Sequence, residues 1–243
     1  LRRQKKMFNN ALIDVNDINE DFILKWFFNL IENTVRTNFY AKSLDDDQLV
    51  SFKLDCKSLQ VSEPRPYKEI FVFHPDMEGV HIRFGAVARG GIRWSDRIED
   101  YRNEIIGLSN TQKVKNVVIV PSGSKGGFVI KKSYLNEEAQ DYSKLYYEMF
   151  MTGLLSVTDN LINQDIIEKP KGVICYDHDD PYLVVAADKG TAMFSDYANA
   201  IAVKQSFWLG DAYASGGSVG YNHKSYGITA KGAWECVKLH FEE

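Results

Sequence analysis

Two glycine-rich segments that carry basic residues are the densest chemical signal in this sequence. They read Ala-Arg-Gly-Gly-Ile-Arg at 88–93 and Val-Pro-Ser-Gly-Ser-Lys-Gly-Gly at 120–127. Glycine lets backbone N–H groups approach a small ligand closely. We expect both segments to be strand-to-helix loops that present Arg89, Gly90, Gly91 and Lys125 to a ligand.

Further cations precede the second segment. Lys113 and Lys115 stand just before Asn116–Val120, a short apolar run that is typical of a buried strand. Ligands of α/β proteins bind at the ends of such strands, and a dianionic small molecule needs a cationic donor for each carboxylate. Neighbouring cations and burial also lower a lysine pKa from ~10.4 towards neutrality, so Lys125 is a candidate general base.

A carboxylate follows the apolar run Tyr182–Ala187, which we expect to be a strand. Asp188 suits two roles, the N-cap of a following helix or a proton-transfer partner at the strand's end, and the local pattern alone favours the cap. Upstream, Asp177-His178-Asp179-Asp180 contains residue types that bind metals. Successive side chains alternate in direction and cannot all face one ion, so a solvated loop is the better interpretation.

Other familiar site patterns are absent. Lys125 is followed by glycine rather than Ser or Thr, so its segment is not a Walker A loop, and the sequence has no Gly-x-Gly-x-x-Gly fingerprint. The five histidines are scattered and the three cysteines form no Cys-x-x-Cys pair. We therefore expect no metal site and no disulfide framework, and a reducing cytoplasm as the compartment.

The composition is that of an ordinary globular protein. The 243 residues are 44% hydrophobic and 26% charged, which is enough to bury a core. The formal net charge of −4 argues against a nucleic-acid binder, and no apolar run approaches the ~20 residues of a membrane helix. The chain starts with Leu1 and a predicted helix runs into Glu243, so we expect a processed protein or a piece of a longer one.

The elements that must position these residues follow from the hydrophobic pattern. We predict one α/β or α+β domain, in which antiparallel strands come first and strands alternate with helices in the middle. The prediction rests on helical spacing and on the alternation of apolar and polar residues in strands. Asp96 and Glu99 form an expected capping box at the start of one helix. The predicted helices are Glu20–Tyr40, Asn136–Asn163, Thr191–Gln205, Thr229–Phe241 and one that follows Asp96. The first of them has Asp17 or Asn19 as its expected cap. The predicted strands are residues 50–56, the two strands of a hairpin (Glu69–Phe73 and Val80–Val87), Asn116–Val120, Gly172–Cys175 and Tyr182–Ala187.

Together the segments resemble the glutamate dehydrogenase family, most closely its very large NAD-dependent bacterial branch. The resemblance covers about Val80 to Phe241 and rests on four strings in the right order. They are Ala-Arg-Gly-Gly-Ile-Arg-Trp-Ser-Asp-Arg (88–97), Lys-Asn-Val-Val-Ile-Val-Pro-Ser-Gly-Ser-Lys-Gly-Gly-Phe (115–128), Asp-Asp-Pro-Tyr-Leu-Val-Val-Ala-Ala-Asp-Lys-Gly-Thr-Ala (179–192) and Phe-Trp-Leu-Gly-Asp-Ala-Tyr-Ala-Ser-Gly-Gly-Ser-Val-Gly-Tyr (207–221).

The resemblance implies a role for individual residues. Lys125 resembles the family's catalytic lysine and Asp188 the catalytic aspartate that handles the amine proton. Lys115, with Lys113 as the alternative, resembles the lysine that binds the substrate α-carboxylate. Arg89, followed by Gly90 and Gly91, occupies the place of a lysine that contacts the side-chain carboxylate. Ser218 and Thr229 resemble the segment that reaches the nicotinamide ribose.

The resemblance also implies an activity and a domain plan. Hydride passes from glutamate to NAD⁺, water activated by Lys125 attacks the iminium, and 2-oxoglutarate and ammonia result, as in amino-acid catabolism; no metal is required. It implies an α/β three-layer sandwich with a mixed, mostly parallel sheet, like the substrate-binding domain of amino-acid dehydrogenases. We expect residues 1–79 to pack on a substrate-binding domain of residues 80–228, and residues 229–243 to be a hinge helix before an absent Rossmann domain. The fragment would be inactive alone, and the full protein a homo-oligomer without nucleic-acid or membrane partners.

Three alternatives remain open. A related amino-acid dehydrogenase would act on a branched or aromatic substrate, but a cation such as Arg89 at the side-chain end favours glutamate. A dicarboxylate-sensing module would use the same cationic cluster without chemistry. A Schiff-base enzyme would use Lys125 to bind a carbonyl substrate covalently.

Overall fold

The computed structural model describes residues 2–41, 49–59, 61, 63–115, 122–132, 139–163, 165–188, 193–218 and 223–242. Its strands are β1 (Thr34–Thr37), β2 (Val50–Asp55), β3 (Lys68–His74), β4 (Met77–Arg83), β5 (Gly91–Trp94), β6 (Ser124–Ile130), β7 (Asn160–Ile162), β8 (Ile166–Glu168), β9 (Val185–Ala187) and β10 (Ala214–Ser215). Its α-helices are α1 (Arg2–Ala11), α2 (Ile18–Asn33), α3 (Tyr101–Lys115), α4 (Ala139–Leu155), α5 (Ser195–Lys204), α6 (His223–Tyr226) and α7 (Ile228–Glu242), and short 3₁₀ turns lie at Leu12–Asp14, Phe39–Ala41 and Gly210–Ala212.

One mixed sheet organises the molecule. Its described strands follow the order β1-β2-β3-β4-β6-β5-β9-β10, and a separate two-stranded ribbon joins β7 to β8. The pairs from β1 to β6 are antiparallel, whereas β6–β5, β5–β9 and β9–β10 are parallel. The expectation of a mostly parallel sheet is therefore wrong, because consecutive strands joined by tight turns, such as β3 and β4, can pair only in antiparallel fashion.

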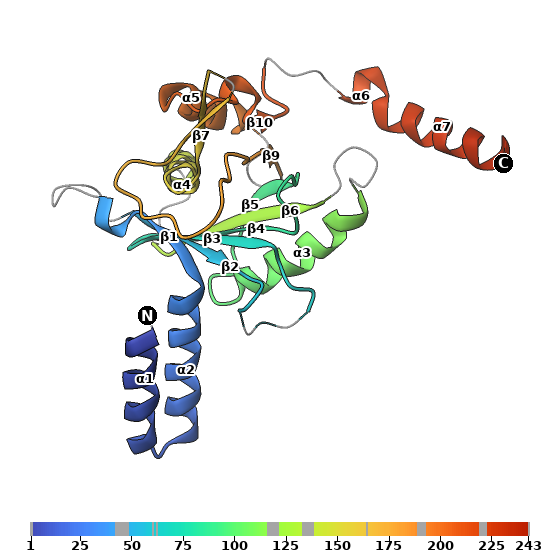
Figure 1. Ribbon diagram of the computed structural model, residues 1–243. Coiled ribbons are helices and arrows are strands. Elements are labelled where there is room, and N and C mark those ends of the chain that lie inside the picture. Colours follow the sequence, from blue (N-terminus) through green and yellow to red (C-terminus); the bar gives the residue numbers. More distant parts are fainter. Residues whose placement is uncertain are drawn as a thin grey trace.

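Helices lie on both sides of this sheet, with α4 and α5 above it and α3 below it in Figure 1. Gly79 and Gly127 show how closely they approach. A Cβ atom on Gly79 would lie 2.5 Å from the Phe150 ring of α4, and one on Gly127 would lie 2.3 Å from Ile105 Cδ1 of α3. The larger core gathers Phe128, Tyr147 and Phe150 with the apolar residues of β9 and α5, and a smaller one surrounds Ile105.

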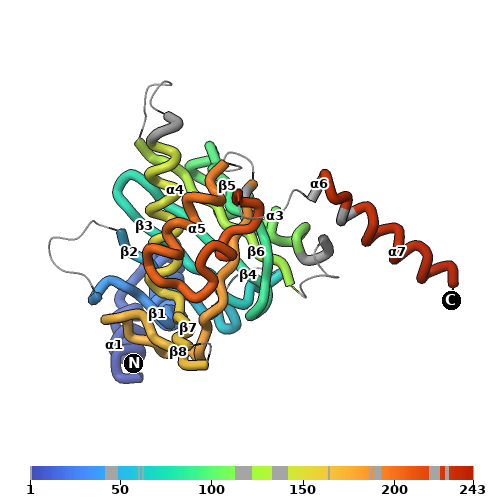
Figure 2. The backbone as a smooth tube through the Cα atoms, turned by 90° about the horizontal axis from the view of Figure 1, so that it is seen from above, coloured from blue at the N-terminus to red at the C-terminus, as the bar shows by residue number. Residues whose placement is uncertain are grey.

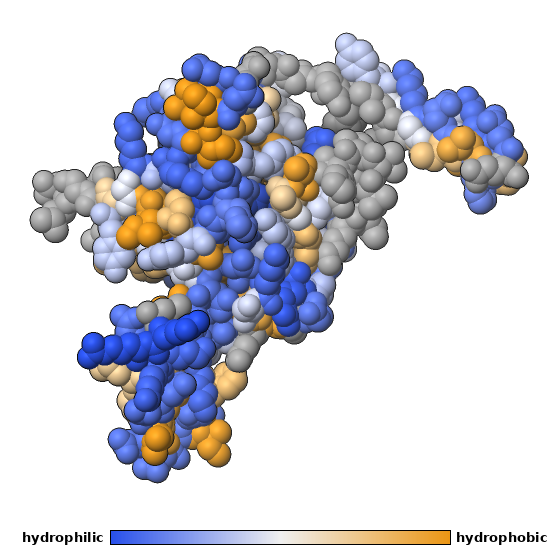
Figure 3. Space-filling model, in the orientation of Figure 1, coloured by the Kyte–Doolittle hydropathy of each residue, from blue (hydrophilic) through white to orange (hydrophobic). Residues whose placement is uncertain are grey.

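Both ends of the chain extend away from the sheet in Figure 1, and Figure 2 shows from above that α7 projects to one side. The α1–α2 pair is held by stacking of Phe8 on Phe28, with ring centroids 4.2 Å apart, and by the Lys5–Glu32 ion pair. Apolar side chains remain exposed at its outer end and along α7, where they are orange in Figure 3. Among the described residues no helix is both long and apolar enough to cross a lipid bilayer.

Several predicted boundaries differ from the observed ones near the start of the chain. Asp17 does cap α2, accepting from the backbone N–H groups of Asn19 and Glu20. The predicted helix Glu20–Tyr40 ends at Asn33, however, because the β-branched run from Thr34 pairs with β2. The predicted hairpin is present, but its strands already meet at His74 and Met77, so the turn is shorter than expected.

Helix starts and ends are also displaced in the middle of the chain. Helix α3 begins at Tyr101, so Asp96 and Glu99 do not form a capping box. The predicted helix 136–163 ends at Leu155, where the Ser156 and Thr158 hydroxyls donate back to carbonyl groups of the last turn. Helix α5 begins at Ser195 and α7 covers the predicted C-terminal helix.

Two predicted strands differ from the structure and a third is not described. Residues 172–175 form no strand, and the run from Tyr182 is a strand only over Val185–Ala187. The predicted strand Asn116–Val120 lies outside the described residues. The predicted domain boundary between residues 79 and 80 falls within β4, since the sheet continues through it.

Candidate active site

An ion pair between Lys125 and Asp188 forms the centre of the candidate site. Lys125 lies on β6 and Asp188 directly follows β9; the Lys125 Nζ atom contacts Asp188 Oδ2. The Lys125 side chain is 3% exposed and that of Asp188 is 31% exposed. The pair is thus a buried ammonium beside a carboxylate that solvent and small molecules can reach.

Gly91 forms the surface over which these two side chains meet. A Cβ atom there would lie 2.9 Å from Asp188 Cβ and 3.2 Å from Lys125 Nζ. Gly90 is even more confined, because a Cβ atom would lie 1.5 Å from the Ser124 carbonyl oxygen. Glycine at 90 lets the chain approach the backbone of β6 closely, and glycine at 91 leaves room for the Lys125 and Asp188 side chains.

The glycine-rich segments are strands rather than the strand-to-helix loops that the sequence suggested. Gly91 begins β5, and Lys125, Gly126 and Gly127 lie inside β6. β5 and β6 run parallel with Ile92 opposite Gly126, which places Gly91 beside Lys125. Gly126 and Gly127 let the Ile92 and Ile105 side chains pack directly on the backbone of β6. The local sequence shows the two glycines but does not show which distant side chains pack against them.

Asp188 is not the cap of a helix in the described part of the chain. Helix α5 begins at Ser195, and Phe194 stands at its N-cap position. Asp188 instead follows the strand that pairs in parallel with β5 and β10. Among the described residues Asp188 therefore caps no helix, and its carboxylate pairs with Lys125 instead.

The end of α3 approaches the same place. A Cβ atom on Gly123 would lie 2.7 to 2.9 Å from atoms of Gln112, so the last turn of α3 packs against the residues that precede Lys125. Lys113 and Lys115 belong to this turn. Their side chains lie outside the described residues.

Arg89 is joined to the segment before Lys125 through its backbone. It forms an isolated parallel bridge with Gly123, donates from its N–H to the Ser122 carbonyl and accepts from the Ser124 N–H. Burial raises the pKa of the Tyr182 phenol, and Arg89 opposes that rise. The Arg89 guanidinium therefore acts electrostatically on the segment that leads to Asp188.

Ser218 lies on a loop at the same edge of the sheet, after β10. Its N–H and its hydroxyl both donate to Asp196 Oδ1 of α5, at 2.7 and 2.9 Å. Among the described residues, a Cβ atom on Gly216 would approach Ser195 Oγ to 4.0 Å, and one on Gly217 would lie 2.6 Å from Asp196 Oδ1. Thr229 is in the first turn of α7, but its side chain lies outside the described residues.

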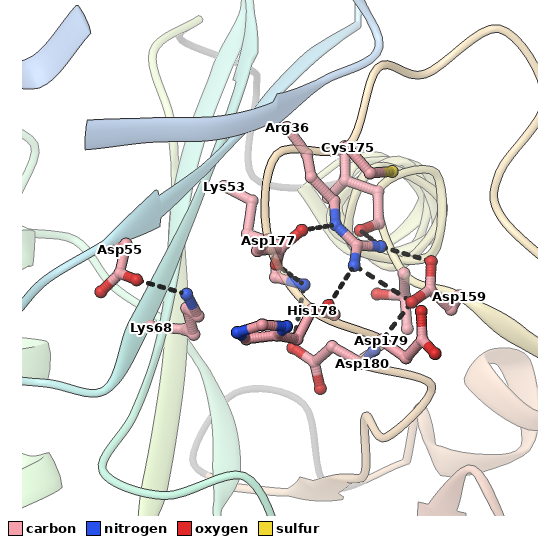
Figure 4. A network of polar contacts seen from close by, with 12 residues as sticks. Arg36, Lys53, Asp55, Lys68, Asp159, Cys175, Asp177, His178, Asp179 and Asp180 are labelled. Atoms are coloured by element: carbon pink, nitrogen blue, oxygen red, sulfur yellow. Dashed lines mark hydrogen bonds and ion pairs between the residues drawn. The ribbon is translucent and has the colours of Figure 1, made fainter. Parts of the chain in front are cut away.

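A second cluster of charges lies behind the candidate site, and Figure 4 shows most of it. Arg36 pairs with Asp159 and Asp177, each at 2.5 Å, and Lys53 pairs with Asp177 at 3.1 Å and Asp180 at 2.8 Å. Arg83 also pairs with Asp180. We call Arg36, Lys53, Arg83, Asp159, Asp177 and Asp180 the ion cluster.

The ion cluster corrects the interpretation of residues 177–180 as a solvated loop. The Asp177 and Asp180 side chains are 5% and 8% exposed, and only His178 and Asp179 face solvent. Burial lowers the pKa of Lys53 to about 7, with Arg36 adding to that effect. Burial would raise the pKa of Asp177, but Lys53 and Arg36 outweigh it and lower this pKa.

Sequence reasoning missed the ion cluster because its members are far apart along the chain. The one local signal is in β4, where His81 and Arg83 alternate with Val80 and Ile82. Such alternation usually indicates a solvent-facing side, yet all four residues are buried. Nothing in the spacing indicates that residues 177–182 cover that side. Within the described residues no group of three or more His, Cys, Asp or Glu side chains forms a metal-binding site.

Comparison with known proteins gives a consistent result. Residues 7–243 match the family model described as bacterial NAD-glutamate dehydrogenase, catalytic domain. The chain is 53% identical over 239 residues to an NAD-specific glutamate dehydrogenase of Pseudomonas aeruginosa, covering 96% of this chain and 15% of that protein. It is 51% identical over 239 residues to the Mycobacterium tuberculosis enzyme of the same name, covering 93% and 15%. Glutamate dehydrogenase 2 of Dictyostelium discoideum is 28% identical over 250 residues, covering 96% and 21%.

The match to the family model covers nearly the whole chain, including residues 7–79, which the resemblance did not reach. The chain spans about 15% of the length of the bacterial relatives. Lys125, Asp188 and the two glycines that bring them together all lie inside the matched range. The chain therefore belongs to the bacterial NAD-glutamate dehydrogenase family and corresponds to its catalytic domain.

Proposed function

We propose that this chain carries the substrate-binding and catalytic residues of an NAD-dependent glutamate dehydrogenase. The reaction converts glutamate, NAD⁺ and water into 2-oxoglutarate, ammonium, NADH and a proton. The observation that carries the proposal is the Lys125–Asp188 ion pair above Gly91, in a chain of this family. The relatives are far longer, so the activity belongs to a longer polypeptide.

Lys125 and Asp188 divide the proton transfers between them. Loss of hydride from the glutamate α-carbon leaves an iminium ion. The Lys125 ammonium gives its proton to Asp188 across their ion pair, and the neutral amine then takes a proton from the water that attacks the iminium. Asp188 passes a proton to the departing nitrogen, which leaves as ammonia. The burial of Lys125 and the partial exposure of Asp188 support this division, because the base must be shielded while the acid exchanges protons with solvent.

The two carboxylates of the substrate need cationic partners near the Lys125–Asp188 pair. We propose that Arg89 binds the side-chain carboxylate and that Lys115, or Lys113 in its place, binds the α-carboxylate. The backbone bridge of Arg89 to Gly123 and the packing of α3 on Gly123 support the proposal. One cation at each end of the substrate selects a dicarboxylate.

NAD⁺ supplies the hydride acceptor when it is bound. The loop of small residues after β10, which includes Gly216 and Ser218, is the segment that we expect to reach the nicotinamide ribose. The anchoring of Ser218 on Asp196 of α5, at the same edge of the sheet as Asp188, supports this proposal. Thr229 would complete this contact. We further propose a three-layer substrate domain of residues 80–228, with residues 1–79 packed on it and 229–243 leading to a nucleotide-binding domain, in a cytoplasmic homo-oligomer.

The test is glutamate-dependent NADH formation by the complete polypeptide and its variants. Lys125→Met and Asp188→Asn should each lower kcat by ~10²-fold or more, since each removes a proton-transfer group. Lys131→Met is the matched control, because Lys131 stands just beyond the same strand and pairs with Glu78; it should retain activity. Full turnover by Lys125→Met would overturn the proposal, and reduction by borohydride to a covalent adduct on Lys125 would favour a Schiff-base enzyme instead.

A further inference from the structure

Arg83 connects the strand of Lys125 to the segment of Asp188. It is the last residue of β4 and is 3% exposed. Its backbone lies opposite Ser124, and Ile82 before it lies opposite Lys125. Successive strand residues point to opposite sides of the sheet, so the Arg83 side chain lies on the side away from Lys125.

The Arg83 side chain contacts the chain that leads to Asp188. Its Nη1 atom donates to the Tyr182 carbonyl at 3.0 Å and to the Ala86 carbonyl at 2.9 Å, and its Nη2 atom pairs with Asp180. Tyr182 stands three residues before β9, and Asp188 stands directly after it. The Arg83 guanidinium thus joins the end of β4, which lies beside Lys125, to the segment that leads through β9 to Asp188.

Asp180, to which Arg83 is paired, makes further buried contacts. Asp180 also pairs with Lys53, and its N–H donates to Asp159 Oδ2 at 2.7 Å. Between Asp180 and Asp188, Leu183 and Val185 are buried in the main core. The segment therefore has little freedom to slide along the sheet without breaking buried contacts.

We propose that Arg83 is a positioning residue, which fixes Asp188 relative to Lys125 through Tyr182 and Asp180. The inference rests on the proposed function of the Lys125–Asp188 pair. Arg83 touches neither side chain of that pair in this arrangement and acts only through the two backbones. A misplacement of ~1 Å between reacting groups costs ~10²-fold in rate. Loss of the Arg83 link should therefore lower kcat strongly and change KM for glutamate little.

Arg83→Lys is the informative variant, because it keeps a positive charge beside Asp180 and loses the guanidinium's simultaneous contacts with Asp180 and the Tyr182 carbonyl. Arg83→Gln removes the charge as well. In the complete polypeptide we expect Arg83→Lys to lower kcat for glutamate oxidation ~10-fold, with KM for glutamate changed less than ~3-fold, and Arg83→Gln to lower kcat further. Arg65→Gln, an exposed arginine that pairs with Glu63, should leave both constants unchanged.

The outcomes separate this inference from the function on which it rests. If Lys125→Met retains turnover, the proposed function is wrong. If Lys125→Met is inactive while Arg83→Lys has the kcat of the unaltered protein, only the positioning role is wrong. A fall of kcat that merely follows the folded fraction measured by circular dichroism, or the failure of both Arg83 variants to fold, would assign Arg83 to stability and overturn the inference.

Discussion

Gly91 decides how closely the Lys125 and Asp188 side chains can meet. A methyl group at Gly91 would lie 2.9 Å from Asp188 Cβ and 3.2 Å from Lys125 Nζ, closer than such atoms normally pack. We predict that Gly91→Ala separates this pair and lowers kcat by ~10-fold or more, measured as glutamate-dependent NADH formation. The loss should exceed any fall in the folded fraction, because the crowding acts on the two functional groups.

Gly107→Ala is the matched control for that substitution. Gly107 lies inside α3, and a Cβ atom there meets nothing within 4 Å. Alanine in a helix interior is favoured over glycine by ~1 kcal/mol, so this variant should be slightly more stable and fully active. Equal activity of the Gly91 and Gly107 variants would show that the space above Gly91 is not needed.

His81 makes a prediction about stability in acid. It lies buried on β4, and neither ring nitrogen has a hydrogen-bond partner among the described residues. Burial, aided by Arg83, lowers its pKa from 6.5 to about 3. The unfolded chain therefore binds a proton at a higher pH than the folded chain does, and the stability that neutral His81 contributes above pH 6.5 is lost as the pH falls towards 3.

The variant His81→Leu should remove this dependence. As the pH falls below 6.5, the unaltered protein should lose up to ~1.4 kcal/mol of unfolding free energy per pH unit through this residue, and the variant should lose correspondingly less. Urea unfolding at pH 7 and pH 5 measures the difference. A gap between the two proteins that stays constant with pH would contradict the depressed pKa.

At the scale of elements, the ion cluster fastens residues 177–182 to the sheet. Arg36 of β1 is fully buried and holds both Asp159 and Asp177. Arg36→Met would leave two buried carboxylates without this partner, which costs ~3–5 kcal/mol for a buried pair. Arg97→Met removes an ion pair with Asp100 that is about half exposed, and it should lower the unfolding free energy far less, because solvent screens exposed ion pairs.

Chemical unfolding of both arginine variants gives the comparison. If the two substitutions destabilise the protein equally, the buried cluster contributes no more than a surface ion pair does. A large effect for Arg36 alone would show that residues 177–182 are held by charge, which explains why a segment with one three-residue strand keeps a fixed path.

Local pattern predicted the elements best where one side of an element faces the core. The hairpin of β3 and β4 and the cap of α2 at Asp17 follow from alternation and capping chemistry. The boundary at Thr34 was not predictable from helical spacing, because pairing with β2 decides it. β6 looked like a loop since Gly126 and Gly127 suit a turn as well as a strand against which Ile92 and Ile105 pack closely.

The candidate site shows the same limit. Residue types and the resemblance identified Lys125 and Asp188, and the structure brings them into contact. The contact itself depends on register, since β5 lies between β6 and β9 and aligns Gly91 with both. Arg83, Asp180 and Lys53 escaped prediction because their pairing depends on long-range topology.

At the scale of the molecule, four antiparallel strands and a parallel set share one sheet. β4 is the junction, with β3 on one side and β6 on the other. Because Arg83 ends β4, the first part of the chain contributes directly to the surroundings of Lys125 even though its own residues lie outside the motifs. We therefore expect residues 1–79 to be required for folding of the catalytic part.

The last prediction concerns which part of the polypeptide binds the substrate and which part binds the nucleotide. The sequence holds no Gly-x-Gly-x-x-Gly fingerprint, and the chain spans about 15% of its bacterial relatives. We predict that residues 1–243 alone bind 2-oxoglutarate weakly and form no NADH from glutamate, because Lys125 and Asp188 can position the substrate but not the nucleotide. Calorimetric titration and a spectrophotometric assay at high enzyme concentration measure the two properties. Turnover by the 243-residue chain would place the whole dinucleotide site within it, and the loop around Gly216 and Ser218 would then be the first place to seek that site.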